Sequence, residues 1–141
     1  MSKEDKNKAN VRRLIEEAYG KGNMSVLSEI FAPEYVLHSA SGDIKSPEGM
    51  KKNMELYRKA LPDMYVKPGQ MVAEGDYVAG VITYGGTFKG ELMGFSPTGK
   101  KINITALVLS RHGKDGRQLE AWSFVDMLDW YRQLGIPIPP G

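Results

Sequence analysis

The stretch Arg117-Gln-Leu-Glu-Ala-Trp-Ser-Phe-Val-Asp-Met-Leu-Asp-Trp-Tyr-Arg-Gln-Leu-Gly135 contains a strand that passes directly into a helix. Its first ten residues follow the glycine-rich turn at 113–116 and are typical of a strand. Its last nine residues have the spacing of a short amphipathic helix that stops at Gly135. Asp126 lies at the junction, where a carboxylate either caps the helix or acts as an acid or base inside a pocket.

The turn at 113–116 joins this strand to another expected strand, Lys101 to Arg111, in an antiparallel hairpin. A four-residue loop would place Val108 opposite Ala121 and Ala106 opposite Ser123. These residues belong to a mostly apolar face, which we expect to face the interior. The other face of the hairpin is mixed and consists of Asn103, Thr105, Leu107, Glu120, Trp122, Phe124 and Asp126. A three-residue loop would slip the pairing by one and mix the two faces.

Two more strands are expected before this hairpin, at Val66 to Ala73 and Tyr77 to Phe88. The first contains Pro68-Gly69, and proline cannot donate to a sheet, so we expect an edge position or a bulge there. Glu74-Gly-Asp76 is expected to be a tight turn, and residues 90–99 to be a loop.

The first half of the chain has the 3.6-residue period of helices. The clearest helix carries one apolar stripe, which consists of Val11, Leu14, Ile15, Ala18 and Tyr19. A second, shorter helix is expected from Asn23 to just before Pro33, with Phe31 on its buried edge. A short extended piece at 35–39 and a polar loop at 40–45 lead to a third helix, which starts at Ser46-Pro47 and ends before Pro62.

Three helices, an antiparallel meander and a closing helix define an α+β fold. We expect a cone-shaped roll, in which the N-terminal helices pack on a strongly curved antiparallel sheet and a short C-terminal helix ends the chain. At 141 residues, the whole chain 1–141 is expected to form one domain. The apolar interior of such a cone is expected to be a ligand cavity.

Composition excludes several classes of function. The 19 Lys and Arg residues against 17 Asp and Glu are scattered, which argues against nucleic-acid binding. No apolar stretch is long enough for a membrane span or resembles a secretory signal, so we expect no membrane partner and a cytoplasmic location. With no cysteine and two histidines, thiolate and three-histidine metal sites are excluded. We therefore expect no metal site.

A series of short motifs spans nearly the whole chain. They are Tyr35-Val-x-His38-Ser-x-x-Gly42, Pro47-Glu-Gly49, Leu61-Pro-Asp-Met64, Glu74-Gly-Asp76, Gly86-Thr with Gly90-Glu91, Pro97-Thr-Gly-Lys100, Asp115-Gly116, Glu120-x-Trp122-x-x-x-Asp126 and Gln133-Leu-Gly135. In this order and spacing the motifs resemble those of the SnoaL-like polyketide cyclases, which belong to the nuclear-transport-factor-2-like superfamily. No single motif is specific, and the resemblance rests on all of them together.

The resemblance implies the same α+β cone. It also implies an activity, the closure of a polyketide ring by a cofactor-free intramolecular aldol condensation. In the characterised cyclases of this family, a histidine and an aspartate on the last two strands move the protons. Counted from the Asp115-Gly116 turn, these positions correspond to Val108 and Ser123 here. Neither side chain can accept an enolising proton near neutral pH, so the resemblance implies the fold with the acid/base pair missing.

Two catalytic candidates remain. For Asp126 we favour the cap of the helix that follows, because a carboxylate bound by backbone N–H groups is a poor base. His38 lies on a short segment that would rim the cavity, and a structural role and a catalytic role are about equally favoured. His112 adjoins the glycine turn and is expected to be exposed. The expected ligand-binding residues are Tyr19, His38, Tyr84, Ala106, Val108, Ala121 and Ser123.

Two functions from different classes follow. The first is a SnoaL-like protein that holds a small apolar or aromatic molecule in the cone without converting it. The alternative is an active cofactor-free enzyme of the aldol cyclase or isomerase type that uses His38 or Asp126. A third alternative is a self-associating domain with a filled cone, in which the aromatic face with Trp122 and Phe124 would form a symmetric contact. We expect a homodimer.

Overall fold

The structure is a computed structural model, and it describes residues 1–140. The elements in chain order are α1 (Lys3–Arg13), η1 (Leu14–Gly20), η2 (Met24–Val26), α2 (Leu27–Ile30), β1 (Phe31–Ser39), β2 (Gly42–Lys45), α3 (Ser46–Ala60), β3 (Tyr65–Glu74), β4 (Tyr77–Thr87), β5 (Lys101–His112), β6 (Gln118–Val125) and α4 (Met127–Leu134). The element η1 is a π-helix that continues α1, and η2 is a short 3-10 helix.

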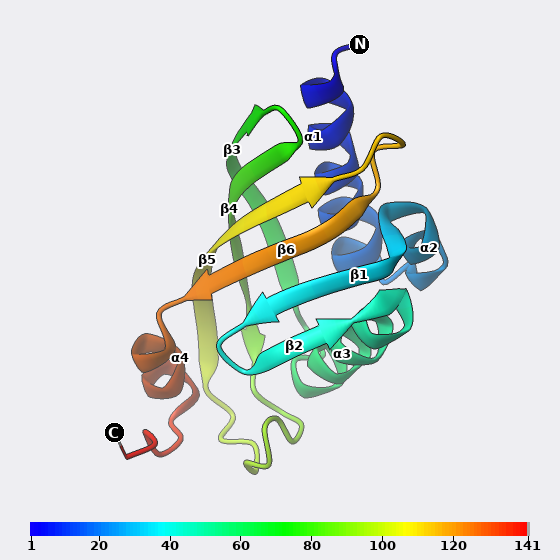
Figure 1. Cartoon of the computed structure of the whole chain (residues 1–141). Coiled ribbons are helices and arrows are strands. Elements are labelled where there is room, and N and C mark those ends of the chain that lie inside the picture. The colour runs from blue at the N-terminus through cyan, green and yellow to red at the C-terminus, as the bar shows by residue number, and fades with distance from the viewer. Residues whose placement is uncertain (141) are drawn as a thin grey trace.

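One curved sheet of six strands, in the order β2-β1-β6-β5-β4-β3, forms the body of the molecule. All neighbouring strands are antiparallel except β1 and β6, which are parallel. Figure 1 shows α1, α2 and α3 together on one side of the sheet and α4 at the far end of β6. The sheet curls around these helices without closing into a barrel. The predicted α+β fold is confirmed.

The β5–β6 hairpin keeps the predicted faces but differs from the predicted register. Val108 pairs with Ser123, and Ala106 pairs with Val125, so each partner lies two residues later than expected. Two changes contribute, since His112 pairs with Gln118 and not with Arg117, and the pairing shifts by one more residue between Arg111 and His112. Because side chains alternate with a period of two, a shift of two residues leaves every side chain on its predicted face.

The segment from Phe31 to Lys45 is more extended than predicted. Phe31 and Pro33 lie in strand β1, not at the end of a helix, since α2 already stops at Ile30. Pro33 falls where the pairing of β1 with β6 is interrupted, so its missing N–H breaks no sheet hydrogen bond. The expected loop at 40–45 contains the short strand β2, which pairs with β1 at the sheet edge.

Local signals for helix ends and bulges are confirmed. Ser46 has φ 67°, and its hydroxyl accepts a hydrogen bond from the backbone N–H of Gly49 at 3.2 Å, so it caps α3 just before Pro47. Gly135 has φ 72° and ends α4. The pairing of β3 with β4 shifts between Pro68 and Met71, at the predicted bulge.

Buried side chains form two clusters. One packs α2 and α3 against β1 and β6 around Phe31 and Met50. The other packs α4 and the end of α3 against β4 and β5 around Phe88 and Trp130. Residues partly buried against each cluster, such as Tyr19 and Tyr84, line the pocket between the sheet and the helices.

Candidate functional site

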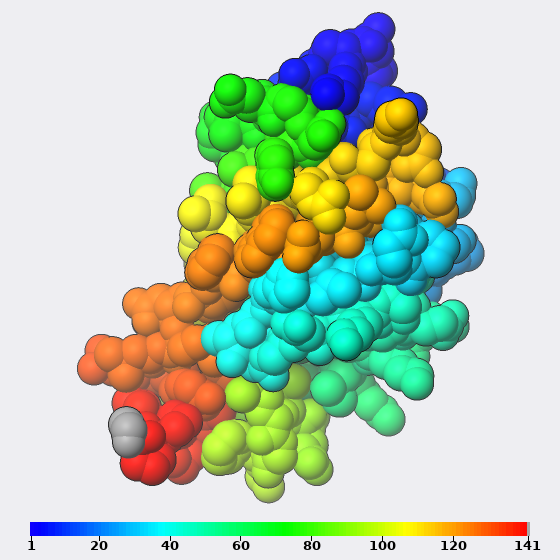
Figure 2. Space-filling view, in the orientation of Figure 1, coloured from blue at the N-terminus to red at the C-terminus, as the bar shows by residue number. Residues whose placement is uncertain are grey.

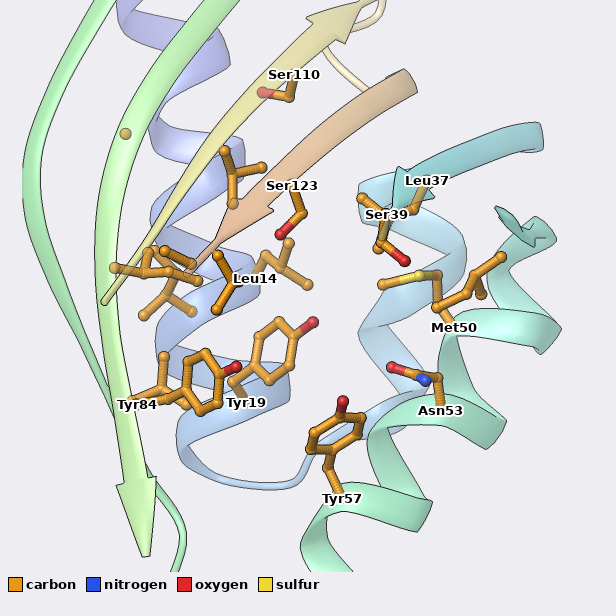
Figure 3. A pocket seen from close by; sticks show the side chains of 18 of the residues that line it. Leu14, Tyr19, Leu37, Ser39, Met50, Asn53, Tyr57, Tyr84, Ser110 and Ser123 are labelled. Atoms are coloured by element: carbon orange, nitrogen blue, oxygen red, sulfur yellow. The ribbon is translucent and has the colours of Figure 1, made fainter. Parts of the chain in front are cut away.

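A pocket of about 210 Å3 lies between the inner face of the sheet and the elements α1, η1 and α3. Most of its lining side chains are apolar. Figure 3 shows Tyr19, Tyr57 and Tyr84 grouped at one end and Ser110 at the other, with Ser39, Asn53 and Ser123 between them. The pocket is therefore mostly apolar, with polar groups at both ends and a few along its walls.

Three tyrosine hydroxyls come from three different elements at one end of the pocket. Tyr19 lies on the π-helix η1, Tyr57 on α3 and Tyr84 on β4. Burial raises the pKa of Tyr19 to about 12 and also raises the pKa of Tyr57 and Tyr84 above the ordinary value. These phenols therefore stay protonated near neutral pH, and each offers a neutral O–H donor.

The π-helix is the local feature that positions Tyr19. The predicted apolar stripe continues through it, because Val11, Leu14 and Ile15 line the pocket together with Tyr19. Arg58 donates a hydrogen bond from Nη1 to the carbonyl oxygen of Tyr19, which ties η1 to α3. Single π-turns within α-helices are frequent at functional sites.

The sheet wall of the pocket comes from β5 and β6. Ala106, Val108 and Ser123 line the pocket, and Val108 lies directly opposite Ser123 in the sheet. The two positions that the family resemblance assigned to the acid/base pair are thus neighbours at the pocket wall. Ala121 is buried in the core beside Val108 and is not part of the pocket lining.

The other polar end of the pocket contains the buried residues Ser110, His112 and Gln118. His112 Nε2 lies 2.8 Å from the hydroxyl oxygen of Ser110, and its Nδ1 lies 2.9 Å from the carbonyl oxygen of Gly116. Ser110 and Gln118 line the pocket, and the His112 ring lies behind Ser110. Burial lowers the pKa of His112 below its ordinary value.

The prediction that His112 is exposed is wrong, because only 2% of its surface is accessible. The turn carbonyl of Gly116 and the hydroxyl of Ser110 satisfy both ring nitrogens, which makes burial of the imidazole possible. The sequence contains a pattern that indicates burial of His112. His112 continues the inward alternation of Ile104, Ala106, Val108 and Ser110 along β5, whereas its nearness to the turn suggested exposure.

His38 lies outside the pocket, on the outer side of β1. Its Nδ1 is 2.9 Å from a carboxylate oxygen of Asp43, and its Nε2 is 2.7 Å from a carboxylate oxygen of Glu120. Its ring also packs at 5.6 Å from Trp122. The hydrogen bond to Glu120, and after it the one to Asp43, raise the pKa of His38 above its ordinary value. Figure 2 shows the outer side of β1 and β6 as a continuous surface.

Asp126 is the cap of α4. Its carboxylate accepts a hydrogen bond from the backbone N–H of Asp129 at 3.1 Å, and α4 begins at the next residue, Met127. Asp126 does not line the pocket. The structure therefore agrees with the structural interpretation of this residue.

Residues 1–140 contain no group of three His, Asp or Glu side chains arranged to hold a metal ion. Within the same range, no helix combines the length and the apolar character required to span a bilayer.

A curved sheet folded over helices around an interior pocket defines the nuclear-transport-factor-2-like class of α+β roll. The family model of SnoaL-like polyketide cyclases matches residues 9–134, and the chain belongs to this family. A search of curated proteins finds no match.

Solved structures of related proteins agree with this family. IdmH from Streptomyces antibioticus has 30% sequence identity, with 92% of this chain and 99% of that chain covered and a TM-score of 0.76. AclR from Streptomyces galilaeus has 29% identity, covers 97% of this chain and 86% of its own, and has a TM-score of 0.79. A SnoaL-like protein from Jannaschia sp. CCS1 shares the fold with a TM-score of 0.86 at 20% identity, over 98% of this chain and 97% of that chain.

Proposed function

We propose that the chain binds a small, largely apolar ring compound that carries a carbonyl group. The observation behind this proposal is the group of three tyrosine hydroxyls, Tyr19, Tyr57 and Tyr84, at one end of a mostly apolar pocket. Protonated phenols donate hydrogen bonds, and a carbonyl oxygen is an acceptor without a proton of its own. The apolar walls would bury the rings of the ligand.

The size of the pocket limits the ligand. An engineered apolar cavity of roughly 150 Å3 binds benzene. A pocket of about 210 Å3 therefore suits one ring or two fused rings unless side chains move. Aromatic polyketides, which carry carbonyl and hydroxyl groups on fused rings, are the compounds that the family name suggests.

Binding without cyclisation is the version of this function that the pocket lining favours. Val108 and Ser123 occupy the positions that the resemblance assigns to the acid/base pair, and neither side chain titrates near neutral pH. His38 lies outside the pocket, and Asp126 is engaged in capping α4. None of these four residues offers a free base to a ligand in the pocket.

A second candidate is a cofactor-free acid/base enzyme of the aldol cyclase or isomerase type. The tyrosine group favours it, because donors that bind a carbonyl oxygen also stabilise the enolate formed from it. Exchange of the methyl protons of 2-acetylnaphthalene for deuterium, followed by NMR, distinguishes the two candidates. An enolising enzyme accelerates the exchange, whereas a binding protein leaves it at the rate in buffer.

The binding proposal is tested by titration of 2-acetylnaphthalene in a calorimeter. We expect saturable binding of one ligand per chain, and a loss of affinity of at least about tenfold in Ala106→Trp, because the indole would occupy the pocket. Leu107→Trp is the matched control. Leu107 follows Ala106 in sequence, but its side chain points outward and is 51% exposed. Leu107→Trp should therefore bind the probe as the wild type does. Equal affinity of Ala106→Trp and wild type would refute the proposal.

We also propose that two copies associate through the outer face of the sheet. Phe124 and Leu107 are neighbours in the β5–β6 pairing, and Phe124 is 63% exposed. Covering such side chains in a symmetric contact would bury apolar surface. Analytical ultracentrifugation should find a dimer for the wild type and a monomer for Phe124→Asp. A monomeric wild type would contradict this proposal.

A further inference from the structure

We propose that Ser110, His112 and Gln118 form a hydrogen-bond-accepting subsite, which binds a hydroxyl group of the ligand at the end of the pocket opposite the tyrosines. This inference rests on the proposed function, since it concerns the second polar end of the same pocket. It specifies the ligand class as a ring compound with a carbonyl group at one end and a hydroxyl group at the other.

The hydrogen bonds of His112 determine which way the Ser110 hydroxyl donates. A carbonyl oxygen only accepts, so the contact of 2.9 Å to Gly116 requires a proton on Nδ1 of His112. In the neutral ring Nε2 then carries a lone pair, and the Ser110 hydroxyl, 2.8 Å away, donates to it. The other acceptor near this hydroxyl, the carbonyl oxygen of Val78, is at 3.4 Å and competes weakly.

This arrangement gives Ser110 the character of an acceptor toward the pocket. A hydroxyl group has one proton and two lone pairs, and the proton is engaged by His112. Ser110 lines the pocket, so its lone pairs are what a ligand there meets. A ligand group that donates a hydrogen bond is therefore preferred at this end.

Gln118 adds a second acceptor by a similar chain of contacts. Asn10 donates from Nδ2 to the carbonyl oxygen of Ile30 at 3.1 Å, which fixes the orientation of the Asn10 amide. Its Oδ1 then accepts from Nε2 of Gln118 at 3.1 Å. One of the two N–H groups of Gln118 is thereby engaged, which orients the amide, and its carbonyl oxygen can accept from a ligand, since Gln118 lines the pocket.

A buried polar atom on α1 lacks a partner. Asn7 is 1% exposed, and in the part of the chain that the structure describes its Nδ2 has no hydrogen-bond partner. On α1 it precedes Asn10 by three residues and the pocket residue Val11 by four, so it lies on the same helix face as both. Buried amide groups without a partner are rare, and this N–H is a donor that the described residues leave unpaired.

The two ends of the pocket therefore have opposite hydrogen-bonding character. The tyrosine end offers O–H donors, whereas the Ser110 end offers oxygen acceptors. A compound with a carbonyl at one end and a hydroxyl at the other matches both ends in one orientation. The reverse orientation would place the ligand's carbonyl oxygen against the lone pairs of Ser110, whose proton is already donated to His112.

The test compares two probes that differ in one group, 2-acetylnaphthalene and 6-hydroxy-2-acetylnaphthalene. We expect the hydroxyl to improve the affinity of the wild type by about fivefold, the usual effect of one net hydrogen bond. In Ser110→Ala this improvement should vanish, so that the ratio of the affinities for the two probes falls to about one. Ser123→Ala is the matched control, because Ser123 also lines the pocket but lies on β6 away from His112, and it should keep the improvement.

The outcomes separate this inference from the proposed function. If neither probe binds, both are wrong. If both probes bind equally well, or if the improvement survives in Ser110→Ala, the subsite is wrong and the binding function stands. Loss of the improvement in Tyr84→Phe, with Ser110→Ala unaffected, would place the hydroxyl at the tyrosine end and overturn the orientation. If Ser110→Ala does not fold, Ser110→Cys gives the same comparison, since a thiol is a weak hydrogen-bonding group of similar size.

Discussion

The two histidines of this chain lie on opposite faces of the same sheet, and their hydrogen bonds favour opposite states of protonation. On the outer face, both nitrogens of His38 contact carboxylates, which only accept, so these contacts favour the charged ring that donates from both nitrogens. On the inner side, His112 donates from Nδ1 to a carbonyl and accepts at Nε2 from Ser110, as a neutral ring does. The pKa shifts agree, raised for His38 and lowered for His112.

This difference explains why His38, the histidine that the sequence favours as a catalytic candidate, is less suited than His112 to accept a proton. His38 occurs in a family motif, but a ring that donates from both nitrogens has no lone pair to accept a proton. His112 occurs next to a turn, yet it retains a lone pair and reaches the pocket through Ser110. The face of the strand decides the chemistry of each imidazole more than its sequence neighbours do.

The largest expected effect is the difference in stability between two alanine variants. His112→Ala removes a buried ring and leaves the Ser110 hydroxyl and the Gly116 carbonyl without their partner, which should cost about 3 kcal/mol. His38→Ala removes a partly exposed ring with charged partners, and such contacts contribute little. Urea unfolding of both variants at pH 7 measures the difference. Equal losses would contradict the contrast between the two faces.

The next effect is the pH dependence of stability. Because the pKa of His112 is lowered by burial, the unfolded chain gains a proton below about pH 6.5 that the folded chain does not, so stability falls as pH falls. The slope for one proton is at most about 1.4 kcal/mol per pH unit. His38 acts in the opposite sense, since its raised pKa gives stability that is present below about pH 6.5 and is lost as pH rises through the raised value.

Urea unfolding at pH 5.5, 6.5 and 7.5 checks these signs. In His112→Gln, the loss of stability between pH 6.5 and 5.5 should become smaller, while the change between pH 6.5 and 7.5 should stay as in the wild type. NMR titration of the two imidazole rings assigns each part of the pH dependence to one histidine. His38 is expected to titrate above pH 6.5 and His112 below pH 6.5. A reversed order of the two midpoints would contradict the proposed protonation states.

The smallest expected effect is at Asp126, where the strand with these two faces ends. Asn caps a helix about as well as Asp, so Asp126→Asn should change the free energy of unfolding by less than about 1 kcal/mol. Binding of 2-acetylnaphthalene should not change either, because Asp126 does not line the pocket. Thermal unfolding and calorimetry measure both quantities. A loss of binding with unchanged stability would return Asp126 to the candidate site.

Local patterns in the sequence were enough to predict much of the fold. The alternation along β5 and β6 placed Val108 and Ser123 on the inner face even though the register was two residues off, because parity survives such a shift. The caps at Ser46 and Asp126 were found because a capping side chain bonds a backbone group only three residues away.

The candidate site was predicted less completely. Two of the seven predicted ligand-binding residues, His38 and Ala121, do not line the pocket. The other five do, and they are Tyr19, Tyr84, Ala106, Val108 and Ser123. Strand β1 reaches its place by pairing in parallel with β6, more than 80 residues away in sequence, and that pairing turns His38 toward Glu120 on the outer side. No local pattern encodes such a contact.

The sequence by itself determined the α+β class, the helix ends and the division of the last two strands into an inner and an outer face. These properties depend on side-chain periods and on hydrogen bonds between near neighbours, which a linear pattern contains. Only the tertiary structure decided that His112 is buried with Ser110 and that His38 lies outside with Asp43 and Glu120. Burial and the pKa of an imidazole depend on groups that the fold brings together from distant parts of the chain.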